Sequence, residues 1–226
     1  MNIMRLLRAL LAFVACTWVL SGCAAGGDRM PIDAAGLTQE DVSRMSLHEE
    51  FDRYHQHYER MQQVLAAAQR QVHDSEWRWT MGDRVPSGGG NENSVVPMAG
   101  STIDNSYALD TSRVWSSPVA GNDRRALQPM IGYFDDQGWL WRERTLGKDH
   151  DVWAVTDDGW RIRYLVINNG NHALTVYSGQ YWTNDSLALT EAIGGRNDAA
   201  YPEESLPGEY PPFPKWSDAI IRPPKI

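Results

Sequence analysis

Residues 151–182, DVWAVTDDGWRIRYLVINNGNHALTVYSGQYW, decide the fold of this chain. Apolar and polar side chains alternate along this stretch, and the alternation stops at Asp157-Asp158-Gly159 and again at Asn169-Gly170-Asn171. Glycine and asparagine accept positive φ angles, so these tripeptides are typical of tight hairpin turns. The stretch therefore predicts an antiparallel meander with strands at 151–156, 160–168 and 173–182.

The strand expected at 160–168 has one apolar and one basic side. Its apolar positions alternate with Arg161 and Arg163, as expected where one face of a sheet is buried and the other meets water. Two further strands are expected, at 139–146 and at 76–81, because both segments alternate in the same way. The sequence thus predicts a sheet of about four to five strands.

An amphipathic helix is predicted over residues 46–73. Ser46 and Glu49 match the pattern of a capping box at its start. Apolar residues then recur at intervals of four and three from Leu47 to Val72, which places them in one continuous stripe along a helix. The stripe fits packing on a sheet or a coiled-coil seam between two copies, and the strand signals downstream favour the sheet.

The remaining segments complete an α+β domain with both helices on one face of an antiparallel sheet. A shorter second helix is expected at 123–134, with Pro129 limiting its start. The single globular domain spans residues 46–200. Residues 86–111 are rich in Gly, Ser, Asn and Pro and are expected to form a long loop. Residues 201–226 are proline-rich and are expected to be an extended, unpacked tail.

Residues 1–22 are predicted to be an export signal. Arg5 and Arg8 supply its positive charge, and residues 9–20 form an apolar run. A spanning helix needs roughly 20 apolar residues, so this run is too short to cross a membrane. The signal ends in Leu20-Ser21-Gly22-Cys23, an aliphatic residue, two small residues and a cysteine.

That motif resembles the lipobox of bacterial lipoproteins. The resemblance implies a diacylglyceryl group, carrying acyl chains such as palmitate, on the Cys23 thiol, and cleavage just before Cys23. The protein is then exported and held by this lipid on the outer face of the plasma membrane, and residues 23–45 are expected to be a flexible tether. An ordinary secretory signal with a chance cysteine is the alternative.

Charge and cysteine content limit the partners of the mature chain. Loss of Arg5 and Arg8 takes the 21 basic residues to 19 while all 29 acidic residues stay, so the net charge moves from −8 to −10. This balance argues against nucleic acid, or an anionic lipid surface, as the main partner. Cleavage also removes Cys16, which leaves Cys23 as the sole cysteine and excludes an internal disulfide.

Four tryptophans on the expected strands are the candidate binding residues: Trp139, Trp141, Trp153 and Trp160. An exposed aromatic platform beside polar side chains binds sugars by stacking, and an envelope protein meets glycans. Tryptophan also builds sheet cores with its polar tip hydrogen-bonded. Core packing is favoured, and the platform remains the alternative.

The sequence contains no catalytic, metal-binding or cofactor-binding pattern. The histidines lack metalloenzyme spacing, and turn chemistry explains Asp135-Asp136 and Asp157-Asp158. Gly88-Gly89-Gly90 lacks the Lys-Ser/Thr of a phosphate loop. We therefore expect a non-enzymatic envelope binding module, with a glycan or a membrane protein as its partner. The alternatives are an accessory subunit docking through its acidic surface or proline-rich tail and, third, a carboxylate-dependent cell-wall hydrolase.

Two segments resemble the mycobacterial LppA-type lipoproteins, a group of small actinobacterial lipoproteins. They run from Tyr54 to Trp79 and from Asp151 to Gly179, and each matches by pattern more than by identity. The chain lacks the extra cysteines of some members, so no disulfide is implied. The resemblance implies a helix-on-sheet domain outside the plasma membrane and carries no activity or functional residues.

Overall fold

The computed structural model describes residues 30–88, 97–117, 121 and 123–225. The chain divides into a unit of Met1–Met30 and a unit of Pro31–Ile226, and the fold below is that of the second unit. The predicted signal at 1–22, the lipobox with Cys23, and residues 89–96 of the predicted loop lie outside the described residues.

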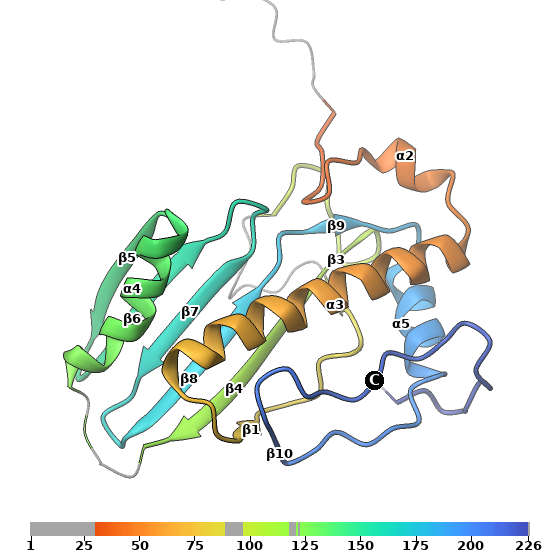
Figure 1. Cartoon of the computed structure of the whole chain (residues 1–226). Helices are drawn as coiled ribbons and strands as arrows, with labels where there is room; N and C mark the ends of the chain where they lie inside the picture. Colours follow the sequence, from red (N-terminus) through yellow and green to blue (C-terminus); the bar gives the residue numbers. More distant parts are fainter. Residues whose placement is uncertain (1–29, 89–96, 118–120, 122, 226) are drawn as a thin grey trace, which may run out of the picture. The chain divides into compact units, whose positions relative to one another are not determined.

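A seven-stranded antiparallel sheet forms the centre of the fold, in the order β10-β1-β4-β8-β7-β6-β5 (Figure 1). Its strands are β1 (Trp77–Trp79), β4 (Asp110–Ser116), β5 (Trp141–Leu146), β6 (Asp149–Val155), β7 (Arg161–Val166), β8 (Asn171–Tyr177) and β10 (Glu204–Ser205). The α+β class is confirmed, and the predicted meander is β5 to β8. The sheet has more strands than predicted for two reasons. The strand β10 lies in the predicted tail, and β4 begins in the predicted loop and continues through residues 112–116, for which no element was predicted.

A second, three-stranded sheet has the order β2-β3-β9, with β2 at Ser87–Gly88, β3 at Ser106–Ala108 and β9 at Tyr181–Trp182. The long loop predicted at 86–111 is therefore wrong where the structure describes it, since it contains β2, β3 and the start of β4. The strand predicted at 173–182 is divided between the two sheets. The chain turns away at Ser178, whose Oγ accepts a hydrogen bond from the Leu109 N–H (2.8 Å).

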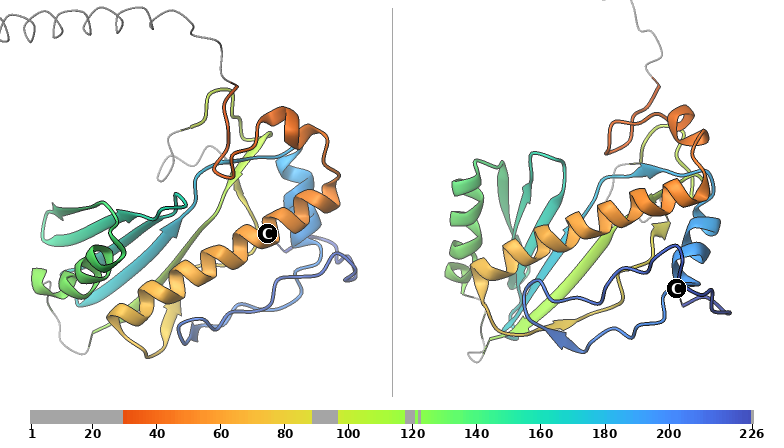
Figure 2. Two further views of the ribbon diagram at one scale, coloured as in Figure 1. Left: turned by 45° about the horizontal axis from the view of Figure 1, so that its top comes forward. Right: turned by 45° about the vertical axis from the view of Figure 1, so that its right-hand side comes forward.

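The helix α3 (Leu47–Val72) crosses one face of the sheet and packs on β4 and β8 (Figures 1 and 2). Ser46 and Glu49 form the predicted capping box, with Ser46 Oγ accepting from the Glu49 N–H (3.3 Å). The second predicted helix is also present, as the 3₁₀ turn η2 (Arg124–Leu127) followed by α4 (Gln128–Gln137) on the same face. The remaining helices are α2 (Gln39–Ser43) and α5 (Ser186–Gly194).

The core lies between these helices and the sheet. From β6 to β8, nearly all side chains that face α3 and α4 are buried, whereas most of those on the opposite face are partly exposed. We call this opposite side of β5 to β8 the open face. Of the helices in the described ranges, none is long and apolar enough to cross a membrane.

The tether predicted for residues 23–45 is wrong from residue 31 onward. Residues 31–45 belong to the folded unit: Ile32 pairs with Thr38 in a β-bridge, and Val42 of α2 is 1% exposed. The unpacked tail predicted at 201–226 is also wrong in its described part. Phe213 is 6% exposed and contacts α3, because the aromatic residues among the prolines supply apolar surface that α3 buries.

Candidate functional site

The sheet separates the four tryptophans of the predicted platform. Trp160 is 3% exposed and belongs to the core under the helices. Trp139 packs against α4, and Trp141 donates its Nε1–H to Asp135 Oδ1 of α4 (2.7 Å). Trp153 lies on the open face. The four side chains therefore do not form one platform. Trp141 is opposite Ala154 in the register, so the neighbouring Trp153 lies on the other face.

Trp153 of β6 forms an aromatic pair with Tyr177 of β8 on the open face. The ring centroids are 5.6 Å apart and the planes differ by 12°. In the strand between them, Arg163 is opposite Trp153 and Arg161 is opposite Tyr177. The guanidinium carbons lie 5.4 Å from the Trp153 centroid and 5.8 Å from the Tyr177 centroid, within the range of cation–π attraction.

Asp151 is the buried anchor of this group. Its carboxylate accepts hydrogen bonds from Arg144 (2.6 and 3.0 Å), from Arg163 Nε (2.9 Å) and from Trp153 Nε1 (2.9 Å). Burial raises the pKa of Asp151, but these hydrogen bonds outweigh it and hold the pKa below its usual value. The charged carboxylate therefore fixes the positions of two arginines and the indole ring.

Two arginines of the same face have no carboxylate partner among the described side chains. Arg142, opposite Trp153 on β5, is exposed and makes no hydrogen bond or ion pair there. Arg161 donates to the Ser178 carbonyl (3.3 Å), and burial lowers its pKa. With Arg144 and Arg163, these residues place four cations on this face, two of which bond the Asp151 carboxylate. We call this group the open-face cluster: Arg142, Arg144, Asp151, Trp153, Arg161, Arg163 and Tyr177.

Exposed apolar side chains border the open-face cluster at one end of the sheet. Val155 is 48% exposed and is opposite Arg161 in the register. Leu140 is 89% exposed, and its carbonyl accepts a hydrogen bond from the Val155 N–H (3.4 Å). The surface thus combines cations, an aromatic pair and aliphatic side chains.

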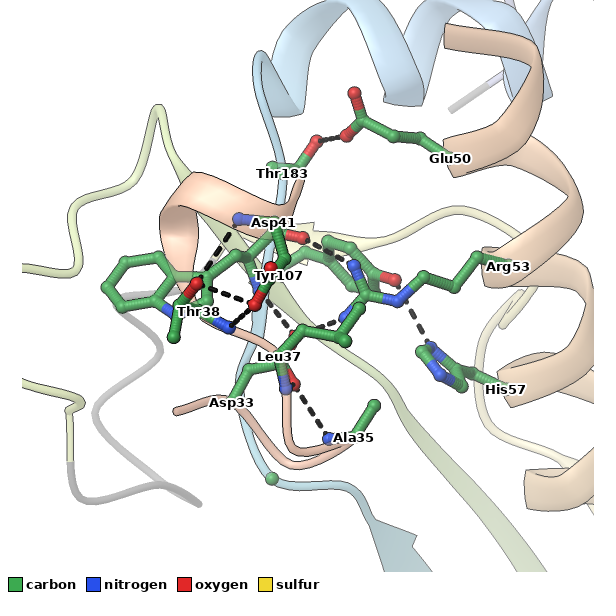
Figure 3. Close-up of polar contacts among 12 residues, drawn as sticks. Asp33, Ala35, Leu37, Thr38, Asp41, Glu50, Arg53, His57, Tyr107 and Thr183 are labelled. Atoms are coloured by element: carbon green, nitrogen blue, oxygen red, sulfur yellow. Dashed lines mark hydrogen bonds and ion pairs between the residues drawn. The ribbon is translucent and has the colours of Figure 1, made fainter. Parts of the chain in front are cut away.

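A second polar group, the N-terminal latch, holds the start of the folded unit (Figure 3). Asp33 Oδ1 accepts from the N–H groups of Ala35 (2.8 Å) and Leu37 (2.9 Å). Asp33 Oδ2 forms an ion pair with Arg53 of α3 and accepts from the Trp182 N–H (3.2 Å). The Asp33 side chain is 0% exposed, so this pair fixes the segment to α3 and β9.

His57 lies beside the latch and stacks on Tyr181, with ring centroids 3.8 Å apart. Its Nδ1 is 3.2 Å from the Tyr107 hydroxyl. This contact is drawn in Figure 3. Burial, together with the nearby positive charge of Arg53, lowers the pKa of His57 to about 3. The imidazole is therefore neutral at neutral pH and serves packing better than proton transfer.

Each of the two acidic pairs has a carboxylate bonded to a neighbouring side chain. Asp158 pairs with Arg60 Nε (2.7 Å), and this hydrogen bond lowers the pKa of the carboxyl. A general acid needs a raised pKa, so Asp158 has the wrong shift for that role. Asp135 accepts the Trp141 hydrogen bond. The described part of the chain holds no cluster of three or more His, Cys, Asp or Glu side chains that suits a metal ion.

A hollow of about 490 Å³ lies between the Met81–Val85 segment and residues 197–201. Its lining is largely apolar, and Asn197 Oδ1 is a buried acceptor without a partner among the described atoms. The described lining residues include no carboxylate. The hollow therefore does not supply a hydrolytic pair either.

The sequence indicated part of the open-face cluster. Arg161 and Arg163 were predicted on the wet side of their strand, and Trp153 was a candidate residue. Tyr177 and Asp151 were missed because pairing across strands depends on register. One sequence pattern near the N-terminal latch could have been recognised. Thr38-x-x-Asp41 matches a capping box, and these residues form one at the start of α2.

Comparisons with known proteins add a distant structural likeness. No family model and no curated protein sequence matches the chain. Among solved structures, the crystal structure of the lipoprotein candidate LppA from Mycobacterium tuberculosis is similar, with a TM-score of 0.40 and 14% sequence identity. The match covers 77% of this chain and 95% of that chain. The resemblance to LppA-type lipoproteins is thus a distant structural one.

Proposed function

We propose that this protein is a lipid-anchored, non-enzymatic binding module on the outer face of the plasma membrane. The anchor is the diacylglyceryl group on Cys23, at the end of Leu20-Ser21-Gly22-Cys23. Two acyl chains give stable membrane attachment, whereas one chain binds only marginally. The mature chain then begins at Cys23 and reaches its folded unit at Pro31.

The open-face cluster supports binding of a negatively charged envelope component. The chain has a net charge of −8, yet this face carries four arginines, two of which bond the buried Asp151 carboxylate. Guanidinium groups bind carboxylate and phosphate oxygens through paired hydrogen bonds. The Trp153–Tyr177 pair adds apolar contact area beside these cations.

An accessory-subunit role through the proline-rich tail has less support. Phe213 is buried against Phe51, Tyr54 and Tyr58 of α3, so the tail's aromatic residues are occupied within the chain. A hydrolase role has no paired carboxylates in either the open-face cluster or the hollow. Binding to the open face remains the function that the geometry supports best.

Mass spectrometry of the purified mature protein tests the anchor. We expect the N-terminal peptide to begin at Cys23 and to carry a diacylglyceryl group. The variant Cys23→Ala should lack both the modification and the cleavage. An unmodified Cys23 in the wild-type protein would exclude the anchor.

Binding to a soluble polyanion tests the face. We expect the lipidated protein in detergent micelles to bind polygalacturonate but not neutral dextran. Quenching of tryptophan fluorescence measures the binding. The variant Arg142→Gln should weaken binding about five-fold, which corresponds to roughly 1 kcal/mol per cation. The control Arg125→Gln, at an exposed arginine of η2, should bind as the wild type does. Equal weakening by both variants would reject the open face as the binding surface.

A further inference from the structure

The chain enters its folded unit beside one end of the open-face cluster. The Ala34 N–H donates to the Gln180 carbonyl (2.9 Å), three residues beyond Tyr177. A Cβ at Gly179 would lie 2.8 Å from the Ala34 Cβ, so the two segments are in close contact. This is the end of the sheet at which Val155 is exposed, since Val155 pairs with Arg161 and Arg161 with Tyr177.

Only residues 24–30 separate Cys23 from the folded unit at Pro31. A fully extended chain spans at most about 3.3–3.6 Å per residue, so the reach from Cys23 to Pro31 is below about 30 Å. The N-terminal latch prevents residues 31–45 from adding to this reach, because Asp33 is buried on Arg53 and Trp182. A lipid on Cys23 therefore keeps this end of the sheet close to the membrane.

The side chains at this end suit a membrane surface. Tryptophan and tyrosine favour the headgroup region of a bilayer, and Trp153 and Tyr177 form the centre of the cluster. Leu140 and Val155 supply exposed aliphatic groups at its edge. Arginine near an anionic lipid surface contributes attraction, and neither Arg142 nor Arg161 has a carboxylate partner among the described residues.

We infer that the open-face cluster docks on anionic lipid headgroups of the membrane that holds Cys23. The domain then lies on the bilayer by its open face and turns its helix-covered face outward. This inference rests on the proposed function, both for the lipid on Cys23 and for the open face as an anion-binding surface. The net charge of −8 argues against an anionic lipid surface for the chain as a whole. The four arginines of the open-face cluster make this face the exception on which the inference rests.

A single reporter cysteine tests the docked orientation. Cys23 is the only cysteine after cleavage and its thiol carries the lipid, so an added cysteine is the one reactive thiol. We would label Val155→Cys with the fluorophore NBD in the full lipidated protein, reconstituted through its own acyl chains. One set of vesicles is pure phosphatidylcholine, and the other contains added phosphatidylglycerol. A matched control places the label at Gln71→Cys, an exposed position on α3.

On the anionic vesicles, we expect the label at position 155 to be protected from reduction by aqueous dithionite. On phosphatidylcholine vesicles, the same label should be accessible to dithionite. The label at position 71 should react equally on both. In the variant Arg142→Gln/Arg161→Gln, the docking constant from this protection should fall about 25-fold, about five-fold for each arginine. Equal reaction at position 155 on both vesicles would overturn the inference, and so would equal protection at position 71.

The polygalacturonate measurement separates the two levels of the proposal. If the wild-type protein binds the soluble polyanion but the label stays open on anionic vesicles, the open face binds an anionic polymer and the lipid inference is wrong. If neither the polymer nor the vesicle is bound, the proposed function fails together with the inference.

Discussion

The two faces of the seven-stranded sheet take their side chains from the same strands but differ in what covers them. On the face under α3 and α4, Ile162, Tyr164 and Val166 of β7 are each 0% exposed. On the open face, Arg161 and Arg163 of the same strand surround an aromatic pair. Burial of the first face stabilises the fold, whereas the second carries the exposed charge on which the proposed binding rests.

Buried carboxylates show the same contrast. Under the helices, Asp83 accepts hydrogen bonds from Arg113 (2.8 Å), Thr111 (2.6 Å) and Gln62 (2.9 Å) and is 3% exposed. On the open face, Asp151 has two arginine partners, of which Arg144 is 38% exposed. The first group is closed to solvent, whereas the second presents its cations outward.

The largest expected effect comes from truncating a tryptophan on each face. Trp160→Ala should lower the free energy of unfolding by about 3–5 kcal/mol, because it leaves a cavity in the core. Trp153→Ala should lower it by about 1 kcal/mol, the scale of an aromatic pair. Urea unfolding followed by circular dichroism measures both. Equal losses would show that the open face is as important to the fold as the covered face.

Removing one cation from each buried carboxylate should give the next largest difference. Arg113→Met leaves Asp83 buried without its ion pair and should cost about 3 kcal/mol. Arg163→Met leaves Asp151 still paired with Arg144 and should cost about 1 kcal/mol. Guanidinium unfolding of the two variants compares these losses. A larger loss for Arg163→Met would reverse the assignment of the two groups.

His57 should make the covered side sensitive to acid. Its pKa is about 3 in the folded chain and about 6.5 when unfolded. The unfolded state binds the proton more readily, so this contribution is complete above pH 6.5 and is lost as the pH falls toward 3. The slope reaches at most about 1.4 kcal/mol per pH unit. His57→Gln should flatten stability against pH in this interval. The control Gln71→Asn, at an exposed position of α3 without a titratable group, should leave the slope unchanged.

The smallest stability effect is expected on the open face at Arg142. The side chain is exposed and has no partner in the described part of the chain, so Arg142→Gln should change the free energy of unfolding by less than about 0.5 kcal/mol. Thermal unfolding checks this value. A loss comparable to that of Trp160→Ala would mean that Arg142 supports the fold.

Periodicity predicted the elements that depend on local sequence. The helix at 46–73 and the meander at 151–182 follow from spacing and turn residues, and both are observed. The strand β4 escaped prediction because Gly- and Ser-rich sequence surrounds it and its partner β8 is distant in the chain. Asp33 was missed for the same reason, since only the folded chain brings Arg53 and Trp182 to it.

The candidate site was predictable only within single strands. Alternation placed Arg161 and Arg163 on a wet face, but it cannot show which residues of neighbouring strands share that face. The four tryptophans were grouped because they lie on or beside neighbouring expected strands, but Trp160 is in the core and Trp153 is on the open face. Conversely, the strand register brings Trp153 of β6 and Tyr177 of β8 into contact, although a strand lies between them.

We propose that one face of the sheet stabilises the fold and that the other binds a polyanion. The variant Arg142→Gln/Arg161→Gln tests this most directly, when unfolding and polygalacturonate binding are measured on the same preparation. We predict a Kd raised about 25-fold, from roughly 1 kcal/mol per cation. The free energy of unfolding should change by less than about 1 kcal/mol. An unchanged Kd, or a fall in stability that accounts for the lost binding, would contradict the account.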